Sequence, residues 1–299
     1  MNGNNKNKFA RNLISYILLI ILAVVGFGGS LWTTNVYRQR VESNEEQAVE
    51  NLCINSLLLG VDKEGYRTDV IIFAQLDVAK GTLNMLQIPR DTYVDGVRRA
   101  NKKINGSYFV YKDGAMQRDI ENVYKEVEML TGLRADNFLL VDTAGFRKII
   151  DAMGGVHFDV PQRMLYSDPE QELYIDLQPG PQFLNGDKAE QLVRFRRYAD
   201  GDIGRVKVQK EFIGATLDKV FSASSVFNLP DLVDIFSDSC ETSFSSEDMY
   251  KFGFVVMGVK RENINILTLE GVAEYRNGIS YYIANNQLNN QVIDEYFTR

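Results

Sequence analysis

A run of twenty residues without a charged side chain, from Leu13 to Trp32, constrains the fold of this chain more than any other feature. A helix of that length rises about 30 Å, which is the thickness of the hydrocarbon core of a membrane. So long a run is rare in soluble proteins, and the sequence therefore predicts one transmembrane helix over residues 13–32. A cleaved signal peptide is the alternative, but its apolar region would be shorter, and no A-x-A-like cleavage site follows closely.

Basic residues on the two sides of this segment indicate its orientation. Three precede it and two follow it, namely Lys6, Lys8 and Arg11 before and Arg38 and Arg40 after. The small excess on the N-terminal side favours a cytoplasmic N-terminus. We therefore expect a single-pass protein of the cell membrane whose C-terminal bulk is extracellular.

The rest of the chain divides into short flanking segments and one domain. Residues 1–12 are the expected cytoplasmic N-terminus, and the polar, acidic residues 33–51 are the expected stalk. Residues 52–299 have the length of one large domain, and 45% hydrophobic and 24% charged residues in the whole chain are typical of a globular protein. The net charge of −7 argues against a nucleic-acid partner, because that binding needs a broad basic surface.

Short apolar runs that alternate with helical patterns predict the fold class. Strands are expected at 54–59, 70–76, 83–88, 137–141, 156–160, 173–177 and 264–269, with a hairpin turn at 79–81. Helices are expected at 117–131, 143–153, 186–196, 204–220, 229–236 and 247–258. The first three strands are apolar at nearly every position, as strands covered on both faces are. The pattern predicts an α/β protein with a central mixed sheet and helices on both faces.

Scarce residue types exclude several kinds of active site. The single histidine, His157, lies in an expected strand, so a role in packing or in a turn is expected for it. Multi-histidine metal sites and histidine-based nucleophilic relays then lack their residues. The cysteines Cys53 and Cys240 lack CxxC spacing, which argues against a zinc or redox motif and leaves a disulfide open.

Charged side chains mark the ends of the first three expected strands. In chain order they are Asp62, Arg67, Asp69, Arg90 and Asp91. If the strands are antiparallel neighbours, these residues meet at one edge of the sheet. The carboxylates Asp62 and Asp69 suit a Mg²⁺ ion that also contacts substrate phosphate, and the arginines suit the phosphate. The plainer alternative is a set of surface loops with incidental salt bridges.

A second charged region follows between residues 192 and 212. Arg194 and Arg196 share a direction only if the chain is extended there. Arg205 and Gln209 are four residues apart and share one helix face if a helix begins near residue 203. Asp202 is either the N-cap of that helix or a direct catalytic residue.

The number of arginines points to an anion with several charges. Guanidinium groups that are brought together repel one another unless carboxylates or a ligand compensate them. A diphosphate is the natural compensator, since each charge-assisted hydrogen bond contributes roughly 1.5–3 kcal/mol. The acidic composition of the whole chain makes this anion site a local feature.

Six motifs together give the chain a resemblance to a known family. They are GVD at Gly60–Asp62, RTD at Arg67–Asp69, IPRDTYV at Ile88–Val94, KING at Lys103–Gly106, DAMGGVHFDVP at Asp151–Pro161 and RFRRYADGDIGRVKVQ at Arg194–Gln209. In order and spacing they resemble the LytR-CpsA-Psr family of cell-wall enzymes, over about residues 57–212. The resemblance implies one N-terminal membrane helix and a three-layer α-β-α sandwich that holds a polyprenyl pyrophosphate in a hydrophobic cavity.

The resemblance also implies a reaction and a role for each matching residue. Such proteins transfer teichoic acid, capsule or a similar glycopolymer from the lipid carrier to peptidoglycan. By resemblance, Asp62 and Asp69 hold Mg²⁺, or Mn²⁺ in its place. The implied diphosphate ligands are Arg67, Arg90, Arg194, Arg196 and Arg205, and the residues implied to orient them or contact the head group are Asp91, Asp202 and Gln209. The family usually has an arginine where Lys207 or Val208 stands. This chain departs from the family pattern at that position.

The expected mechanism combines positioning with electrostatic stabilisation. A hydroxyl of the acceptor attacks phosphorus, Arg90 and its neighbours stabilise the leaving phosphate, and Asp69 or Asp91 takes the proton. Two alternatives use the same residues. One is a pyrophosphatase with water as acceptor, and the other is a non-catalytic membrane-bound sensor of lipid diphosphates.

Overall fold

The computed structural model describes residues 53–61, 67–96, 101–169, 173–199, 202–220, 239–245, 247–249, 255–256 and 259–298. The expected membrane segment and stalk, the helix expected at 229–236, most of the one at 247–258, and Asp62 lie outside these ranges. Within the ranges, no helix combines the length and the apolar character needed to cross a membrane.

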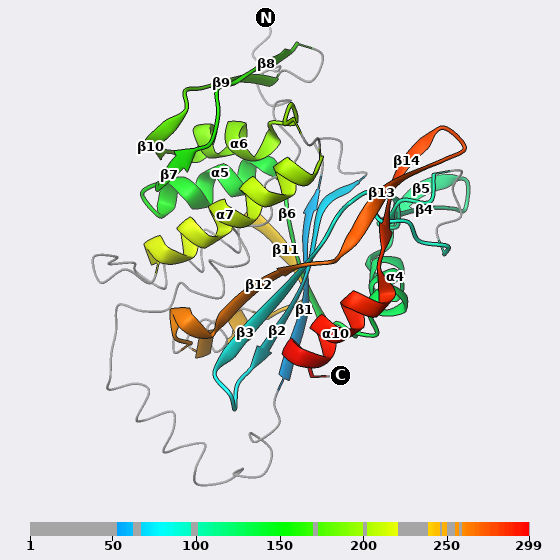
Figure 1. Cartoon of the computed structure of the whole chain (residues 1–299). Coiled ribbons are helices and arrows are strands. Elements are labelled where there is room, and N and C mark those ends of the chain that lie inside the picture. Colours follow the sequence, from blue (N-terminus) through cyan, green and yellow to red (C-terminus); the bar gives the residue numbers. More distant parts are fainter. Residues whose placement is uncertain are drawn as a thin grey trace, which may run out of the picture.

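A six-stranded sheet forms the centre of the molecule (Figure 1). In spatial order its strands are β11 (Cys240–Thr242), β6 (Asn137–Val141), β1 (Cys53–Val61), β2 (Thr68–Asp77), β3 (Thr82–Ile88) and β12 (Ile264–Thr268). β6 is parallel to β1 and β12 is parallel to β3, whereas β2 and β11 are antiparallel to their neighbours. The expected α/β class with a central mixed sheet is confirmed.

The three central strands form where the apolar runs predict them. Every residue of β2 is buried, which requires cover on both faces of the sheet. Alternate side chains then enter different cores, with Ile72 in one hydrophobic cluster and Ile71 and Phe73 in the other. The hairpin from β2 to β3 turns through Gly81, whose φ of +60° a glycine adopts without steric cost.

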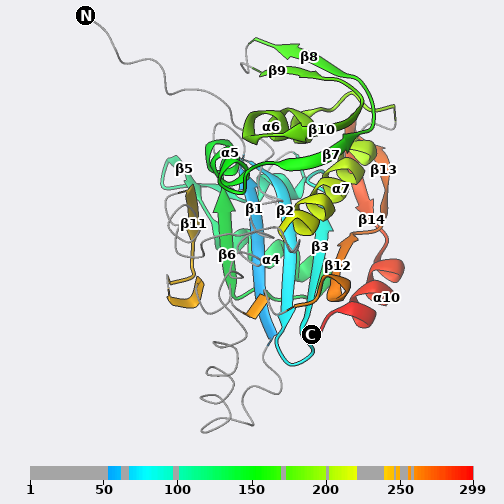
Figure 2. The same ribbon diagram turned by 90° about the vertical axis from the view of Figure 1, so that its left-hand side faces the viewer.

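One face of the sheet is covered by α5 (Thr143–Ala152), α6 (Gly186–Arg194) and α7 (Asp202–Val220) (Figures 1 and 2). Two antiparallel pairs extend this layer: β7 (Val156–Val160) with β10 (Gly180–Leu184), and β8 (Met164–Asp168) with β9 (Leu173–Leu177). α5 begins where the Asp142 side chain accepts a hydrogen bond from the Gly145 N–H. Its residues Phe146 and Ile150 are fully buried against the sheet, each contributing about 1.5–3 kcal/mol.

The other face carries α4 (Ile120–Thr131) and the C-terminal helix α10 (Asn286–Tyr296) (Figure 1). Around them lie the short helix η1 (Ile104–Gly106), the hairpin of β4 (Phe109–Lys112) and β5 (Ala115–Arg118), and the hairpin of β13 (Gly271–Arg276) and β14 (Ile279–Ala284). The short helix η2 (Arg261–Asn263) precedes β12. The core on this face includes Phe73, Tyr108, Val123 and Ile293.

Several boundaries differ from the sequence prediction. The helix expected from residue 117 begins at Ile120, because β5 occupies the preceding residues and Asp119 caps the helix by accepting from Asn122 N. The helix expected to residue 196 ends at Arg194, because Phe195 is extended. The C-terminal third, for which the sequence indicated only general structural roles, adds β11 and β12 to the sheet and the two-stranded β13–β14 hairpin.

Candidate functional site

Strand directions bring the charged residues of the first region to one edge of the sheet. β1 and β3 run in the same direction, and β2 runs opposite to both. The carboxyl ends of β1 and β3 therefore lie beside the amino end of β2. The chain reaches this edge with Asp69 at the start of β2 and with Arg90 and Asp91 just after β3.

A β-bulge sets the direction of Asp69. Gly60 pairs with Val70 and Val61 pairs with Thr68, so Asp69 is the extra residue between two pairings. A bulge of this kind bends the strand and re-aims the side chain at that point. The carboxylate of Asp69 thereby meets two arginines: Arg196, which follows α6, and Arg90, which follows β3.

Asp69 is the centre of the site. It is only 2% exposed, and its Oδ1 accepts a hydrogen bond from Arg90 Nη1 at 2.5 Å. Arg196 Nη2 lies 3.6 Å from Asp69 Oδ2. Within the described part of the chain, Oδ2 itself accepts no hydrogen bond. One buried carboxylate thus holds two guanidinium groups that come from positions 106 residues apart in the sequence.

Asp91 is held by a residue that the sequence analysis did not single out for a role. Lys103 Nζ lies 3.0 Å from Asp91 Oδ2, while Arg90 Nε lies 3.8 Å from Asp91 Oδ1. The backbone is fixed as well, because the Asp91 carbonyl accepts from the Tyr282 N–H of β14 at 2.9 Å. The KING motif contained the only sequence signal for this contact, and the pairing itself depends on the fold.

Arg194 and Arg196 point to different partners. Arg194 is the last residue of α6, and its Nη1 donates to Glu190 Oε1 at 2.7 Å, one turn back along the helix. Arg147 of α5 reaches the other oxygen of Glu190 at 3.3 Å. Burial raises the pKa of Glu190, more than Arg194 and Arg147 lower it. The structure therefore places Arg196, and not Arg194, against Asp69; the i, i+4 spacing could have indicated the Glu190 pair.

Helix α7 brings its two predicted residues to the inside of the molecule. Arg205 and Gln209 are each 2% exposed, and Gln209 Nε2 donates to the Val193 carbonyl of α6 at 3.0 Å. The amide of Gln209 thus ties α7 to α6 next to Arg194. α7 begins at Asp202, although the side chain of that residue lies outside the description.

Two predicted site residues remain, Arg67 and Asp62. Arg67 precedes β2 and is exposed, and Asp62 lies outside the described residues. Among the residues that the structure describes, no group of three or more His, Cys, Asp or Glu side chains could hold a metal ion. Of the predicted metal pair, Asp62 and Asp69, the structure describes only Asp69.

The histidine and the cysteines lie apart from this site. His157 is exposed on β7, against the ring of Phe183, which corrects the expectation of core packing or a turn. Cys53 begins β1, whereas Cys240 pairs with Val141 at the carboxyl end of β6, which runs parallel to β1. Since the two thiols lie at opposite ends of the sheet, they cannot form a disulfide.

The fold and this edge define an α/β protein with arginines and carboxylates gathered from separate parts of the chain. Its class follows from comparison with known proteins. A model of the LytR_cpsA_psr family matches residues 31–297. The chain belongs to this family.

Individual relatives are similar along most of the chain. The polyisoprenyl-teichoic acid–peptidoglycan teichoic acid transferase TagU of Oceanobacillus iheyensis is 31% identical over 251 residues, covering 82% of this chain and 76% of the relative. The transferase of the same name from Bacillus subtilis is 26% identical, covering 98% of this chain and 97% of the relative. The crystal structure of Bacillus subtilis TagV, at 25% identity, has a TM-score of 0.65 and covers 84% of this chain and 99% of that one.

Proposed function

We propose that this chain transfers a glycopolymer, such as teichoic acid, from a polyprenyl-pyrophosphate carrier to a hydroxyl of peptidoglycan and releases polyprenyl phosphate. The observation that carries the proposal is the meeting of Asp69, Arg90 and Arg196 at one sheet edge. The relatives named as polyisoprenyl-teichoic acid–peptidoglycan teichoic acid transferases support the choice of donor and acceptor.

The two guanidinium groups at Asp69 suit a diphosphate. The side chain of Arg90 is 17% exposed and that of Arg196 is 45% exposed, whereas Asp69 is buried beneath them. Asp69 balances their charge and fixes their positions, and a guanidinium, with five N–H groups, can contact a carboxylate and a phosphate at the same time. The planar fork of arginine matches phosphate oxygens better than a lysine does. Arg67 and Arg205 are proposed as further ligands, and Arg194 as a residue that supports them.

The proposed reaction is a phosphoryl transfer. The oxygen of the acceptor hydroxyl forms a bond to the phosphorus next to the sugar. The bond from that phosphorus to the bridging oxygen breaks, and polyprenyl phosphate leaves with the electron pair. Arg90 and Arg196 stabilise the charge that develops on it. We assign the proton of the hydroxyl to Asp91, because its side chain is 24% exposed and that of Asp69 is 1% exposed.

A divalent metal ion fits one part of this site. Asp69 Oδ2 is buried and lacks a hydrogen-bond donor among the described residues. A bound cation can satisfy such an oxygen by coordinating it. Asp69 would hold Mg²⁺, or Mn²⁺, together with Asp62. When bound, the ion would supply positive charge to the phosphate oxygens.

The membrane placement is part of the proposal. The charge-free segment at 13–32 would anchor residues 52–299 outside the cell, next to a lipid-linked donor in the same membrane. Protease added to intact protoplasts should then remove the domain and leave a short anchored fragment. A chain that stays whole until the membrane is lysed would contradict this topology.

Replacement of one arginine tests the proposed function. Arg90→Lys keeps the charge and loses the fork, so we expect transfer to fall by about 100-fold, equivalent to roughly 3 kcal/mol. The assay supplies a lipid-linked donor and measures two products: the polyprenyl phosphate that is released and the polymer that becomes attached to peptidoglycan. Arg118→Lys is the matched control, because Arg118 forms an exposed salt bridge with Glu241. Near-normal transfer by Arg90→Lys, or release without any peptidoglycan product in the unmodified chain, would overturn the proposal.

A further inference from the structure

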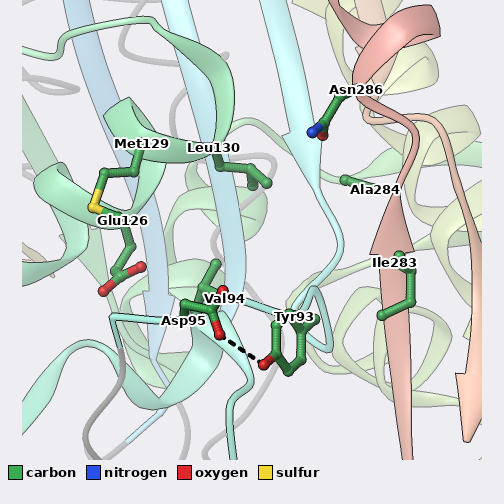
Figure 3. A pocket seen from close by; sticks show the side chains of 9 residues that line it. All are labelled: Tyr93, Val94, Asp95, Glu126, Met129, Leu130, Ile283, Ala284 and Asn286. Atoms are coloured by element: carbon green, nitrogen blue, oxygen red, sulfur yellow. Dashed lines mark hydrogen bonds between the residues drawn. The ribbon is translucent and has the colours of Figure 1, made fainter. Parts of the chain in front are cut away.

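A pocket of about 290 Å³ lies on the opposite face of the sheet from α6 (Figure 3). Its walls come from α4, from β14 with the start of α10, and from the segment that follows β3. Its lining residues include Asp95, Glu126, Met129, Leu130, Ile283 and Asn286. Figure 3 shows Leu130 reaching from α4 toward the middle of the pocket, with Glu126 beside Met129 on the near side and Ile283 and Asn286 on the far side.

Glu126 is an unusual residue for such a wall. It is 3% exposed in the middle of α4, and its carboxylate accepts from the backbone N–H of Gly96. A Cβ built on Gly96 would collide with this carboxylate, so the end of the Glu126 side chain lies directly against the Gly96 backbone. Among the described residues, no cationic side chain forms an ion pair with Glu126. A buried carboxylate with so little compensation is costly unless a ligand supplies the charge.

Among the described residues, the charged groups near Glu126 compensate it only in part. Asp95 adds a second carboxylate, whose Oδ1 accepts from Tyr93 Oη at 2.7 Å. Lys102 is close enough to lower the pKa of Glu126, but burial raises this pKa by more. The ammonium of Lys102 donates to the backbone carbonyl of Asp95 at 2.9 Å, and Lys102 does not line the pocket.

The remaining walls are apolar and leave room for a short stem. Met129, Leu130 and Ile283 present methyl and methylene groups, and Asn286 adds one neutral amide. The volume is at the small end of the range for ligand pockets. Two carboxylates disfavour phosphate and carboxylate ligands by like-charge repulsion and favour a cation whose stem contacts apolar side chains.

We propose that this pocket binds a primary ammonium group on a short apolar stem. Resting on the proposed function, we infer further that the group is a free amine of the peptidoglycan acceptor. The pocket is close to the reaction edge, because Tyr282 N donates to the Asp91 carbonyl and the next residue of β14, Ile283, lines the pocket. An acceptor whose amine is bound in the pocket would lie beside the segment that carries Arg90 and Asp91.

Titration with simple amines tests the pocket by itself. The full chain in detergent is titrated with n-pentylamine and with 1-pentanol, which has the same stem and no charge. We expect pentylamine to bind about tenfold more tightly, since charge-assisted hydrogen bonds are stronger than neutral ones. Glu126→Gln should abolish the difference. Glu128→Gln, an exposed residue two positions further along α4, should preserve it.

Three results would overturn the pocket assignment: equal binding of the amine and the alcohol, an unchanged preference in a folded Glu126→Gln protein, or loss of the preference in Glu128→Gln. If Glu126→Gln fails to fold, Asp95→Asn takes its place, with a severalfold loss of preference expected. An unchanged preference in that variant would also count against the pocket.

Acceptors with and without a free amine test the second inference. Peptidoglycan fragments are compared before and after N-acetylation, and we expect acetylation to raise the KM for acceptor about tenfold in the unmodified chain and not in Glu126→Gln. An unchanged KM, with pentylamine still bound, would mean that the amine comes from another source. Absence of transfer with every acceptor would instead overturn the proposed function, and the pentylamine titration would still decide the pocket.

Discussion

Two environments of opposite charge flank the segment that follows β3. At the sheet edge, Arg90 and Arg196 share the buried carboxylate of Asp69. In the α4 pocket, Glu126 is buried without an ion pair among the described residues. The difference teaches that buried charges of both signs are tolerated, but by different means. The edge compensates its arginines within the protein, whereas the pocket leaves a carboxylate that an external cation can compensate.

A second contrast lies inside the arginine-rich region. The side chain of Arg194 is 3% exposed and paired with Glu190, whereas that of Arg196 is 45% exposed and lies near Asp69. Two arginines of one motif thus have different surroundings. The buried pair suits structural support, and the exposed arginine suits contact with a ligand.

The largest effect is expected for Asp69→Asn, which breaks the compensation at the sheet edge. The variant leaves Arg90 and Arg196 without their carboxylate, so transfer should fall by about 100-fold or more, and a metal requirement should shift to higher Mg²⁺ concentration. Transfer rates measured over a Mg²⁺ series check both effects. Asp77→Asn is the control, since Asp77 is buried and ion-paired with Lys80 at the other end of β2. Equal losses in the two variants would show that the sheet edge has no special role.

An intermediate effect is expected from the two neighbouring arginines, and it separates stability from function. Arg194→Gln leaves Glu190 buried with weaker compensation, so the free energy of unfolding should fall by about 3 kcal/mol. Arg196→Gln should change it by less than about 1 kcal/mol and lower transfer roughly tenfold. Urea unfolding and the transfer assay on both variants test this. A reversal of the two patterns would assign the ligand role to Arg194.

The smallest effect is a pH dependence of stability at Glu126. Burial raises its pKa in the folded chain, so the folded state holds this proton more tightly than the unfolded state does. Its contribution is present below the unfolded pKa of about 4.3 and is lost as pH rises through the folded pKa. Glu126→Gln should therefore gain stability relative to the unmodified chain as the pH rises above about 4.3, by about 1.4 kcal/mol for each pH unit until the folded pKa is passed.

Unfolding in urea at several pH values, with Glu128→Gln as the exposed control, measures this gain. A difference that shrinks as the pH rises would show that Glu126 is compensated in the folded protein and would remove the contrast with the sheet edge.

The sequence predicted the central strands well because burial on both faces leaves an unbroken apolar run. It also predicted that Arg90 would return to Asp69 if the first three strands were antiparallel neighbours, and the observed pairing meets that condition. It missed both strands of the β13–β14 hairpin, whose side chains apart from Tyr281 are half-buried or exposed and show no regular alternation of buried and exposed positions. The β4–β5 hairpin was hidden for the same reason, and its second strand was assigned to the following helix.

The contacts that position the site residues could not be predicted from local sequence patterns. The bulge at Asp69 is a property of two paired strands and has no signal in either strand alone. The contact of Lys103 with Asp91 depends on how the loop after β3 folds back, and the reach of Arg147 to Glu190 depends on the packing of α5 against α6.

The sequence by itself determined the class of elements, the hairpin turn between the second and third strands and the residue types suited to phosphate. These properties depend on burial patterns and on short connections, which are local. Only the tertiary structure decided that Arg196 faces Asp69 and that Glu126 lines a pocket. The reason is that a charged side chain takes its partner from whatever the packing of distant elements brings within a few ångströms, and that choice is not encoded in its neighbours along the chain.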